Sequence, residues 1–191
     1  MAFWTSNKVE PKRQFRFLVD ITPVNNLNTI ASYYIKTAKK PTFQMDGTAQ
    51  VKYVQHTFKY PGRITWQPID ITLIDPATPD AAAILMNILR DCGYAAPTTE
   101  GQAQESISKQ EANNALGTIY LRQIDHRGAS IEEWKLWNPF LVSVDFGTMG
   151  YDSDDLVEYT LNIDYDYATV KTFEDENGNI TPVRGGVSHS D

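Results

Sequence analysis

The chain has a single cysteine, Cys92, and no long run of hydrophobic residues. One cysteine cannot form an intrachain disulfide, and this usage is typical of proteins made in a reducing compartment, so we expect cytosolic synthesis. The longest apolar run is only a few residues, and no transmembrane helix is expected. The first residues, MAFWTSNKVEPKR, lack the basic region followed by an apolar stretch that is typical of a secretory signal.

Catalytic and metal-binding motifs are also lacking. The three histidines, His56, His126 and His189, are far apart, and no pair has the spacing of metal ligands. There is no nucleophile elbow, phosphate loop or dinucleotide fingerprint. The acidic runs at 152–155 and 174–179 are typical of solvated turns, and Phe173 stands where a calcium loop needs its first ligand. We therefore expect no enzyme, no metal and no cofactor.

The chain lacks an excess of basic residues, since its net charge is −7. This balance argues against a protein that holds nucleic acid by neutralising phosphates. Residues 1–63 carry ten Lys and Arg against three acids, whereas residues 64–191 carry seven against twenty-one. Two interpretations stay open. The halves form complementary surfaces on neighbouring copies, or they interleave in one sheet and their charges mix.

The composition, 41% hydrophobic and 21% charged, is that of a globular protein, and 191 residues suffice for one well-buried domain. Alternating apolar and polar residues predict strands, with Phe15 and Phe17 facing a core and Gly128 in a hairpin turn. The predicted strands are 14–21, 31–38, 51–60, 64–75, 116–125, 130–137, 138–147 and 155–168. Residues 39–50 are predicted to form a loop, and Pro68 indicates a sheet edge or a bulge.

One helix is predicted at 79–92, with Thr78 as N-cap, Pro79 at the first helical position and Gly93 as the stop. The polar stretch 102–115 is either a short helix or a flexible excursion. The fold class is thus mainly β, an antiparallel sandwich or barrel with one flanking α-helix. We expect an N-terminal arm at 1–12, a β domain at 13–172 with an insertion at about 95–115, and a mobile polar tail at 173–191.

The last predicted strand has two contrasting faces. One face is apolar and the other is polar and acidic, because a strand alternates its side chains across the sheet. The apolar residues are Val157, Tyr159, Leu161, Ile163, Tyr165 and Tyr167, and the polar ones are Glu158, Thr160, Asn162, Asp164 and Asp166. The apolar face belongs to a core, which leaves the purpose of the acidic face to be explained.

The order of these segments resembles that of tail tube proteins from contractile-tailed bacteriophages. The C-terminal third is similar in its hairpin followed by Leu136, Trp137 and Pro139, then a strand, an acidic turn and the final strand Tyr159–Tyr165. The first half is similar in its Lys-Thr-Ala strand end at 36–38 and in the strand 66–75 before the helix. The resemblance covers about residues 13–168, and this chain departs from it in the insertion at 95–115 and in the tail.

The resemblance implies a structural virion protein that assembles into stacked hexameric rings, in which strands of six copies close an inner β-barrel. It also implies a sheath, baseplate and tail terminator as partners, DNA only in transit through the lumen on contraction, and no membrane insertion. An inner tube of a DNA-free contractile injection system shares this fold and remains an alternative. A monomeric β-sandwich that binds a ligand is an alternative from a different class.

The resemblance also gives an expected place to the charged residues. Acids that line a water-filled lumen would repel DNA and let it slide. The expected lumen residues are Glu158, Asp164, Asp166, Asp145 and Asp20, with the solvent-facing outside of the tube as the alternative. Ring stacking is expected to use the loop 39–50, the strands beside it and the N-terminal arm, where basic residues would meet acids of the next ring. The expected stacking residues are Lys39, Lys40, Lys12 and Arg13.

Overall fold

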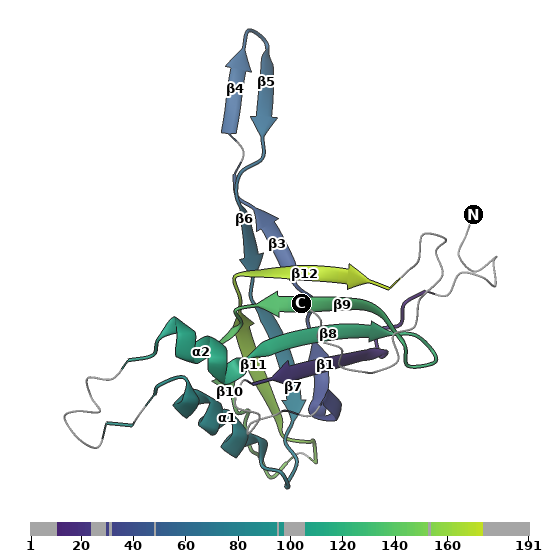
Figure 1. Ribbon diagram of the computed structural model, residues 1–191, viewed down its shortest axis with the longest axis vertical. Coiled ribbons are helices and arrows are strands. Elements are labelled where there is room, and N and C mark those ends of the chain that lie inside the picture. The colour runs from purple at the N-terminus through teal and green to yellow at the C-terminus, as the bar shows by residue number, and fades with distance from the viewer. Residues whose placement is uncertain are drawn as a thin grey trace.

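The computed structural model describes residues 11–23, 30, 32–47, 49–94, 96–97, 106–152 and 154–173. Two four-stranded antiparallel sheets form the body of the protein, and their strands cross one another (Figure 1). Sheet I has the order β1 (Phe17–Thr22), β8 (Thr118–Ile124), β9 (Ser130–Trp137), β12 (Tyr167–Thr172). Sheet II has the order β10 (Phe140–Asp145), β11 (Glu158–Asp164), β7 (Ile69–Ile74), β2 (Ile35–Ala38). The predicted mainly β, antiparallel sandwich is confirmed, and the described strands of one chain do not close a barrel.

The core lies between the two sheets and takes every second residue of the central strands. In sheet II, Leu161 and Ile163 of β11 are fully buried and lie opposite Ile71 and Ile69 of β7. In sheet I, Val19 and Ile119 have no exposed surface. Full burial of a Leu or Ile side chain stabilises a fold by about 1.5–3 kcal/mol, so these alternating positions fix which face of each strand turns inward.

The predicted helix is α1 (Ala81–Asp91), but its N-cap is Asp80, and the assignment of Thr78 as N-cap and Pro79 as first helical residue was wrong. The Asp80 carboxylate accepts hydrogen bonds from the backbone N–H groups of Ala82 and Ala83, which is what an N-cap requires. Asp75 ties the same end to β11, because its carboxylate accepts hydrogen bonds from the Ala81 N–H at 3.2 Å and from the Tyr159 hydroxyl at 2.6 Å. The hydrogen bond to Asp75 raises the pKa of Tyr159 to about 12.

The C-terminal end of α1 agrees with the prediction. Gly93 adopts a φ of 97°, its N–H donates to the Arg90 carbonyl, and the Tyr94 N–H donates to the Leu89 carbonyl. These two bonds are the Schellman arrangement, in which glycine supplies the left-handed conformation. The polar stretch 102–115, for which the sequence allows a short helix or a flexible excursion, contains a helix. This helix, α2 (Lys109–Leu116), packs against α1 and β10. Its N-terminal flank 98–105 lies outside the described residues.

The largest difference from the prediction is an arm of four strands that projects from the body (Figure 1). Residues 39–50 are not a loop, and 51–60 is not one strand. The arm consists of a base, β3 (Thr42–Met45) paired with β6 (Ile64–Gln67), and a tip, β4 (Ala49–Tyr53) paired with β5 (His56–Tyr60). The predicted strand 64–75 is divided at Pro68, where the missing N–H donor ends β6 in the arm before β7 begins in sheet II.

Three further expectations need correction, and two fall outside the described residues. The predicted strand 155–168 ends at Asp164, and the turn at Tyr165 and Asp166 carries the chain from sheet II to β12 of sheet I. Phe15 does not face the core, since 71% of it is exposed. The predicted strand 31–38 starts only at Ile35, after a 3₁₀ turn (Ser32–Tyr34). The polar tail from residue 174 and residues 1–10 of the predicted N-terminal arm lie outside the described residues. Within the described residues, no helix is long and apolar enough to cross a membrane.

Candidate functional site

Among the described residues, the side chains with catalytic potential do not come together. His56 lies at the tip of the arm, His126 lies in the β8–β9 turn, and His189 is outside the described residues. Cys92 is buried at the end of α1, where burial and the neighbouring Asp91 raise the pKa of its thiol. In the part of the chain that the structure describes, no group of three His, Cys, Asp or Glu side chains could hold a metal ion.

The acidic alternation of β11 lies on the outer face of sheet II, away from the core. Glu158 and Asp164 occupy this face on β11, and Asp145 reaches it from β10, where it lies opposite Thr160. The sequence prediction missed Asp70 on β7, whose carboxylate accepts a hydrogen bond from the Asn162 amide at 2.8 Å. Short polar side chains fill the middle of the face, namely Thr37, Thr72, Ser143, Thr160 and Asn162. At its ends the register places Ile74 opposite Glu158 and Phe140 opposite Asp164. The middle of the outer face of sheet II is thus polar and acidic, with short side chains.

The other two acids of the predicted lumen set lie elsewhere. Asp166 is in the turn between the sheets, where Lys109 and Asn138 donate to it and lower the pKa of its carboxyl. Asp20 is on the outer face of sheet I and forms an ion pair with Arg122 at 2.7 Å. On sheet II, Glu158 is paired with Lys36. The structure therefore brings Asp145, Glu158 and Asp164 onto one face, places Asp166 at its end, and separates Asp20 from them.

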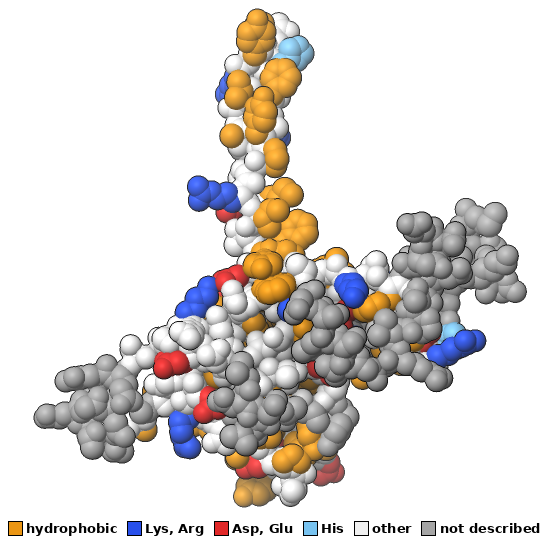
Figure 2. Space-filling model, in the orientation of Figure 1, with side chains coloured by type: hydrophobic (Ala, Val, Ile, Leu, Met, Phe, Trp, Pro, Cys, Tyr) orange, Lys and Arg blue, Asp and Glu red, His pale blue; other side chains and the backbone are white. Residues whose placement is uncertain are grey.

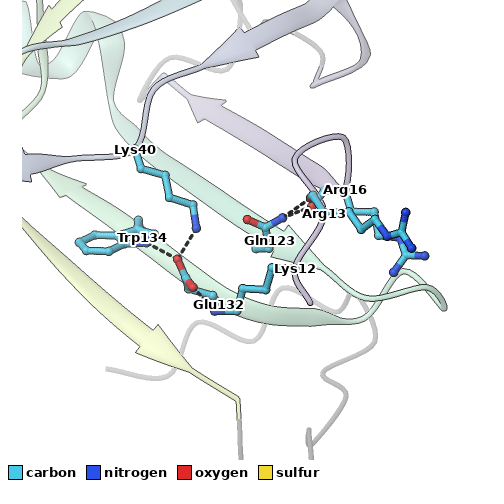
Figure 3. Close-up of polar contacts among 7 residues, drawn as sticks. All are labelled: Lys12, Arg13, Arg16, Lys40, Gln123, Glu132 and Trp134. Carbon is cyan, nitrogen blue, oxygen red and sulfur yellow. Dashed lines mark hydrogen bonds and ion pairs between the residues drawn. The ribbon is translucent and has the colours of Figure 1, made fainter. Parts of the chain in front are cut away.

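Two of the four predicted stacking cations point inward to one carboxylate (Figure 3). Glu132 lies on the inner face of β9 and is only 9% exposed. Its carboxylate forms ion pairs with Lys12 of the N-terminal segment and with Lys40 at the start of the arm. The Trp134 indole N–H also donates to it, at 2.6 Å. Close by, the buried amide of Gln123 donates to the carbonyls of Arg13 and Arg16. These contacts fasten the N-terminal segment and the base of the arm to sheet I.

Glu132 should make the stability of the protein depend on pH. Burial alone would raise the pKa of its carboxyl, but the hydrogen bonds from Lys12, Lys40 and Trp134 lower the pKa to about 2. A carboxyl whose pKa is lower in the folded than in the unfolded state stabilises the fold above its unfolded pKa of about 4.3. That contribution is lost as the pH falls toward 2.

Replacing Glu132 with glutamine tests this contribution. We expect the E132Q protein to lose about 2 kcal/mol of unfolding free energy at pH 7, and the difference from the unmodified protein to shrink as the pH approaches 2. Urea denaturation at pH 7, 4 and 2.5 measures it. The matched control is E133Q, which removes a more exposed ion pair with Arg122 on the outer face and is expected to cost about 1 kcal/mol or less. A difference that stays constant across the pH range would contradict the assignment.

The arm carries a long exposed apolar surface (Figure 2). The register of the tip places one set of side chains on each face of the hairpin. One face holds Ala49, Val51, Tyr53, His56, Phe58 and Tyr60, and the other holds Gln50, Lys52, Thr57 and Lys59. At the base, Phe43 and Trp66 share a face with Met45 and Ile64. Among the described residues, the four large apolar side chains of this face, Val51, Tyr53, Phe58 and Tyr60, are 52–72% exposed. A contiguous exposed apolar face of this kind is typical of an interaction surface.

The sequence contained a signal for this hairpin that the prediction did not use. The apolar residues occupy odd positions at Val51 and Tyr53, and even positions at Phe58 and Tyr60. A change of phase within an alternating segment indicates a turn, because a continuous strand keeps its period of two. The turn itself is hard to recognise, since Val54 adopts a φ of 52° in place of the usual Gly or Asn.

Comparison with solved structures shows which known proteins share this fold. No protein-family model and no curated protein sequence matches the chain. Structures of the anti-feeding prophage match it at a TM-score of 0.61. One, of the baseplate, has 13% identity and covers 86% of this chain and 97% of that chain. The other, of the tube-terminating cap, has 16% identity and covers 90% and 99%. The chain has a phage tail-tube-like fold.

A third structure with this tail-tube-like fold comes from an extracellular contractile injection system. It shows the sheath/tube terminator of that system, PVC, in the extended state. Its TM-score is 0.58 at 16% identity, over 86% of this chain and 99% of that chain. The three matched structures are thus of a baseplate, a tube-terminating cap and a sheath/tube terminator. At identities this low, the similarity shows a shared fold.

Proposed function

We propose that this protein is a structural tube subunit, without catalytic activity, whose copies form six-membered rings that stack into the hollow inner tube of a contractile tail. The observation that carries the proposal is the apolar face of the arm. Side chains such as Tyr53 and Phe58 are more than half exposed in the single chain, and burial of such surface drives association. A neighbouring copy that covers the arm supplies that burial.

The outer face of sheet II is proposed to line the lumen. Its short polar side chains leave the bore open, and Asp145, Glu158 and Asp164, with Asp166 at the end of the face, give it negative charge. Such a wall repels a polyanion and favours its passage over its adhesion. Asp20 belongs to the opposite side of the sandwich and is assigned to the outside of the tube, where the other sheet meets the sheath.

The arm changes the proposed basis of ring stacking. Lys12 and Lys40 are both engaged with Glu132 of their own chain, whose single negative charge balances one of their two positive charges. Lys39 and Arg13 are exposed and stay in the proposed stacking surface. The larger contribution is assigned to the apolar face of the arm. The proposed partners are further copies of the chain, a sheath, a baseplate and a tail terminator, in a virion assembled in the host cytoplasm.

A tube without DNA is the second candidate. It is favoured by the matched structures, which are titled as an anti-feeding prophage and an extracellular contractile injection system. The two candidates differ in payload and not in subunit structure. Head and packaging genes beside the gene for this protein would indicate a phage tail, and their absence from a complete cluster with a sheath gene would indicate the DNA-free system.

Electron microscopy of the purified protein tests the proposal. Concentrated protein, alone and with its purified baseplate, is expected to give hollow six-fold rings or tubes, in which a cryo-EM map places Asp145, Glu158 and Asp164 at the bore. A map with these side chains on the outside would remove the lumen assignment and keep the tube. A protein that stays monomeric and does not add onto the baseplate would contradict the tube and favour a ligand-binding sandwich.

A further inference from the structure

The arm leaves the body where the ladder of sheet II is interrupted. A hydrogen bond of 3.0 Å from the Lys39 N–H to the Asp70 carbonyl extends the pairing of β2 with β7. Pairing in the arm begins only with β3 and β6, and Pro68 has no N–H to donate between the two ladders. The chain therefore passes from body to arm through two short connections, at 40–41 and at Pro68. Such connections act as hinges unless other contacts hold them.

One strand of the base is held by a hydroxyl group of the body. The Tyr165 hydroxyl donates to the Gln67 carbonyl at 2.9 Å, directly beside the connection at Pro68. The Tyr165 side chain is buried, and its ring packs against that of Trp66 at a centroid distance of 6.0 Å. This contact fixes where the arm begins. A hairpin held at one point can still swing about that point, so its direction requires a second contact.

The other strand of the base is held by Glu132 of sheet I (Figure 3). The Lys40 ammonium, two residues before β3, lies 2.6 Å from Oε1 of the Glu132 carboxylate. The Trp134 indole N–H donates to the same oxygen, so the carboxylate is itself held in place by its own strand. Because the Glu132 side chain is only 11% exposed, water screens this ion pair less than a pair on the open surface.

Beyond these contacts, little of the body touches the arm. Every described residue of β3, β4 and β5 is exposed, so packing does not fix the direction of the hairpin past its root. Because the hairpin is long, a small rotation at the root moves its tip a large distance (Figure 1). The contacts at Glu132 and Tyr165 are therefore placed where they control the position of the whole apolar face.

We propose that the ion pair between Glu132 and Lys40 sets the direction of the arm, with the contact between Tyr165 and Gln67 as its pivot. Held at both points, the arm projects at one angle from sheet I. Glu132 is thus a positioning residue. The direction is a property of the single chain, and only its consequence for stacking rests on the proposed tube. There, an arm already held at one angle loses less conformational entropy when a neighbour covers it.

Two lysine substitutions separate the direction of the arm from the stability of the protein. Lys40→Met removes the partner of Glu132 that belongs to the arm and leaves Lys12 in place. Lys12→Met does the reverse. Each variant takes one cation from the same carboxylate, so we expect similar losses of unfolding free energy. Only Lys40→Met breaks the link between sheet I and the arm, which makes Lys12→Met its matched control.

Spin labels report the direction of the arm in dilute, monomeric protein. One label is attached at Thr57→Cys on the polar face of the tip and one at Ser143→Cys on β10, in a Cys92→Ala background. Electron–electron double resonance should give a narrow distance distribution without further change and with Lys12→Met. Lys40→Met should make the distribution at least about twice as wide. A distribution that stays narrow with Lys40→Met, or that Lys12→Met widens equally, would overturn the inference.

Tube formation tests the consequence separately. Lys40→Met is expected to raise the protein concentration at which tubes form about tenfold more than Lys12→Met does. Equal tube formation by both variants, with a swinging arm only in Lys40→Met, would overturn the consequence for stacking. Labelled protein with a fixed arm that forms no tubes, even on its baseplate, would contradict the proposed tube and leave the role of Glu132 intact.

Discussion

Replacing Gly117 with alanine is expected to lower the free energy of unfolding by more than about 3 kcal/mol, a large fraction of the stability of an ordinary domain. Gly117 joins α2 directly to β8 with φ and ψ of 70° and −131°, a conformation that side chains exclude. A Cβ at this position would lie 1.9 Å from the Thr22 carbonyl oxygen of β1. The substitution therefore forces apart two elements of the core.

Gly128 provides the control for this prediction. It also has a positive φ, 80°, but a Cβ there would meet no atom within 4 Å. G128A should therefore cost only the left-handed strain of about 1–2 kcal/mol. Thermal and urea denaturation of both variants measure the contrast. Equal losses would show that strain alone matters and that the close approach of Thr22 to Gly117 is absent in solution.

The central strands were predictable from the sequence because they obey one rule. On β11 the alternation of Tyr159, Leu161 and Ile163 with polar residues is set by burial against β7, and the structure keeps that pattern. The same rule placed Glu158 and Asp164 together on one face. It failed after Asp164, because the chain changes sheets at Tyr165 and Asp166 without Gly or Pro to mark the turn.

The polar contacts at Glu132 could not be predicted in the same way. The carboxylate lies on β9, whereas its two lysines come from the N-terminal segment and from the start of the arm. Only the folded topology brings these three segments together. A sequence shows that Lys12 and Lys40 are charged, and we expected these cations to meet acids of the next ring. Long-range pairing of this kind leaves no local pattern.

The arm is where the prediction erred most, and its removal is expected to have the largest effect on assembly. Asp46 and Arg63 lie opposite each other at its base, since the Asp46 N–H donates to the Arg63 carbonyl at 2.7 Å. Residues 47–62 can therefore be replaced by a two-residue Asn-Gly turn. The shortened chain should fold with an almost unchanged melting temperature, because every described residue of the tip is exposed and none belongs to the core.

Assembly of the shortened chain should be lost. Val51, Tyr53, Phe58 and Tyr60 each stand half exposed or more, and covering each of them contributes about 1 kcal/mol. Four such contributions amount to about a thousandfold in the association constant at each contact, and a tube repeats the contact in every copy. Sedimentation of concentrated protein, checked by electron microscopy, is expected to show monomers where the full chain gives tubes.

A substitution on the other face of the hairpin separates an apolar contact from a charged one. Lys52→Ser with Lys59→Ser alters only the polar face of the tip and keeps its four large apolar side chains. This variant should still form tubes if burial drives the contact, because its apolar face is intact. Tubes formed by the shortened chain would show that the arm is dispensable. Loss of tubes in the lysine variant alone would instead assign the contact to charge, which would weaken sharply with added salt.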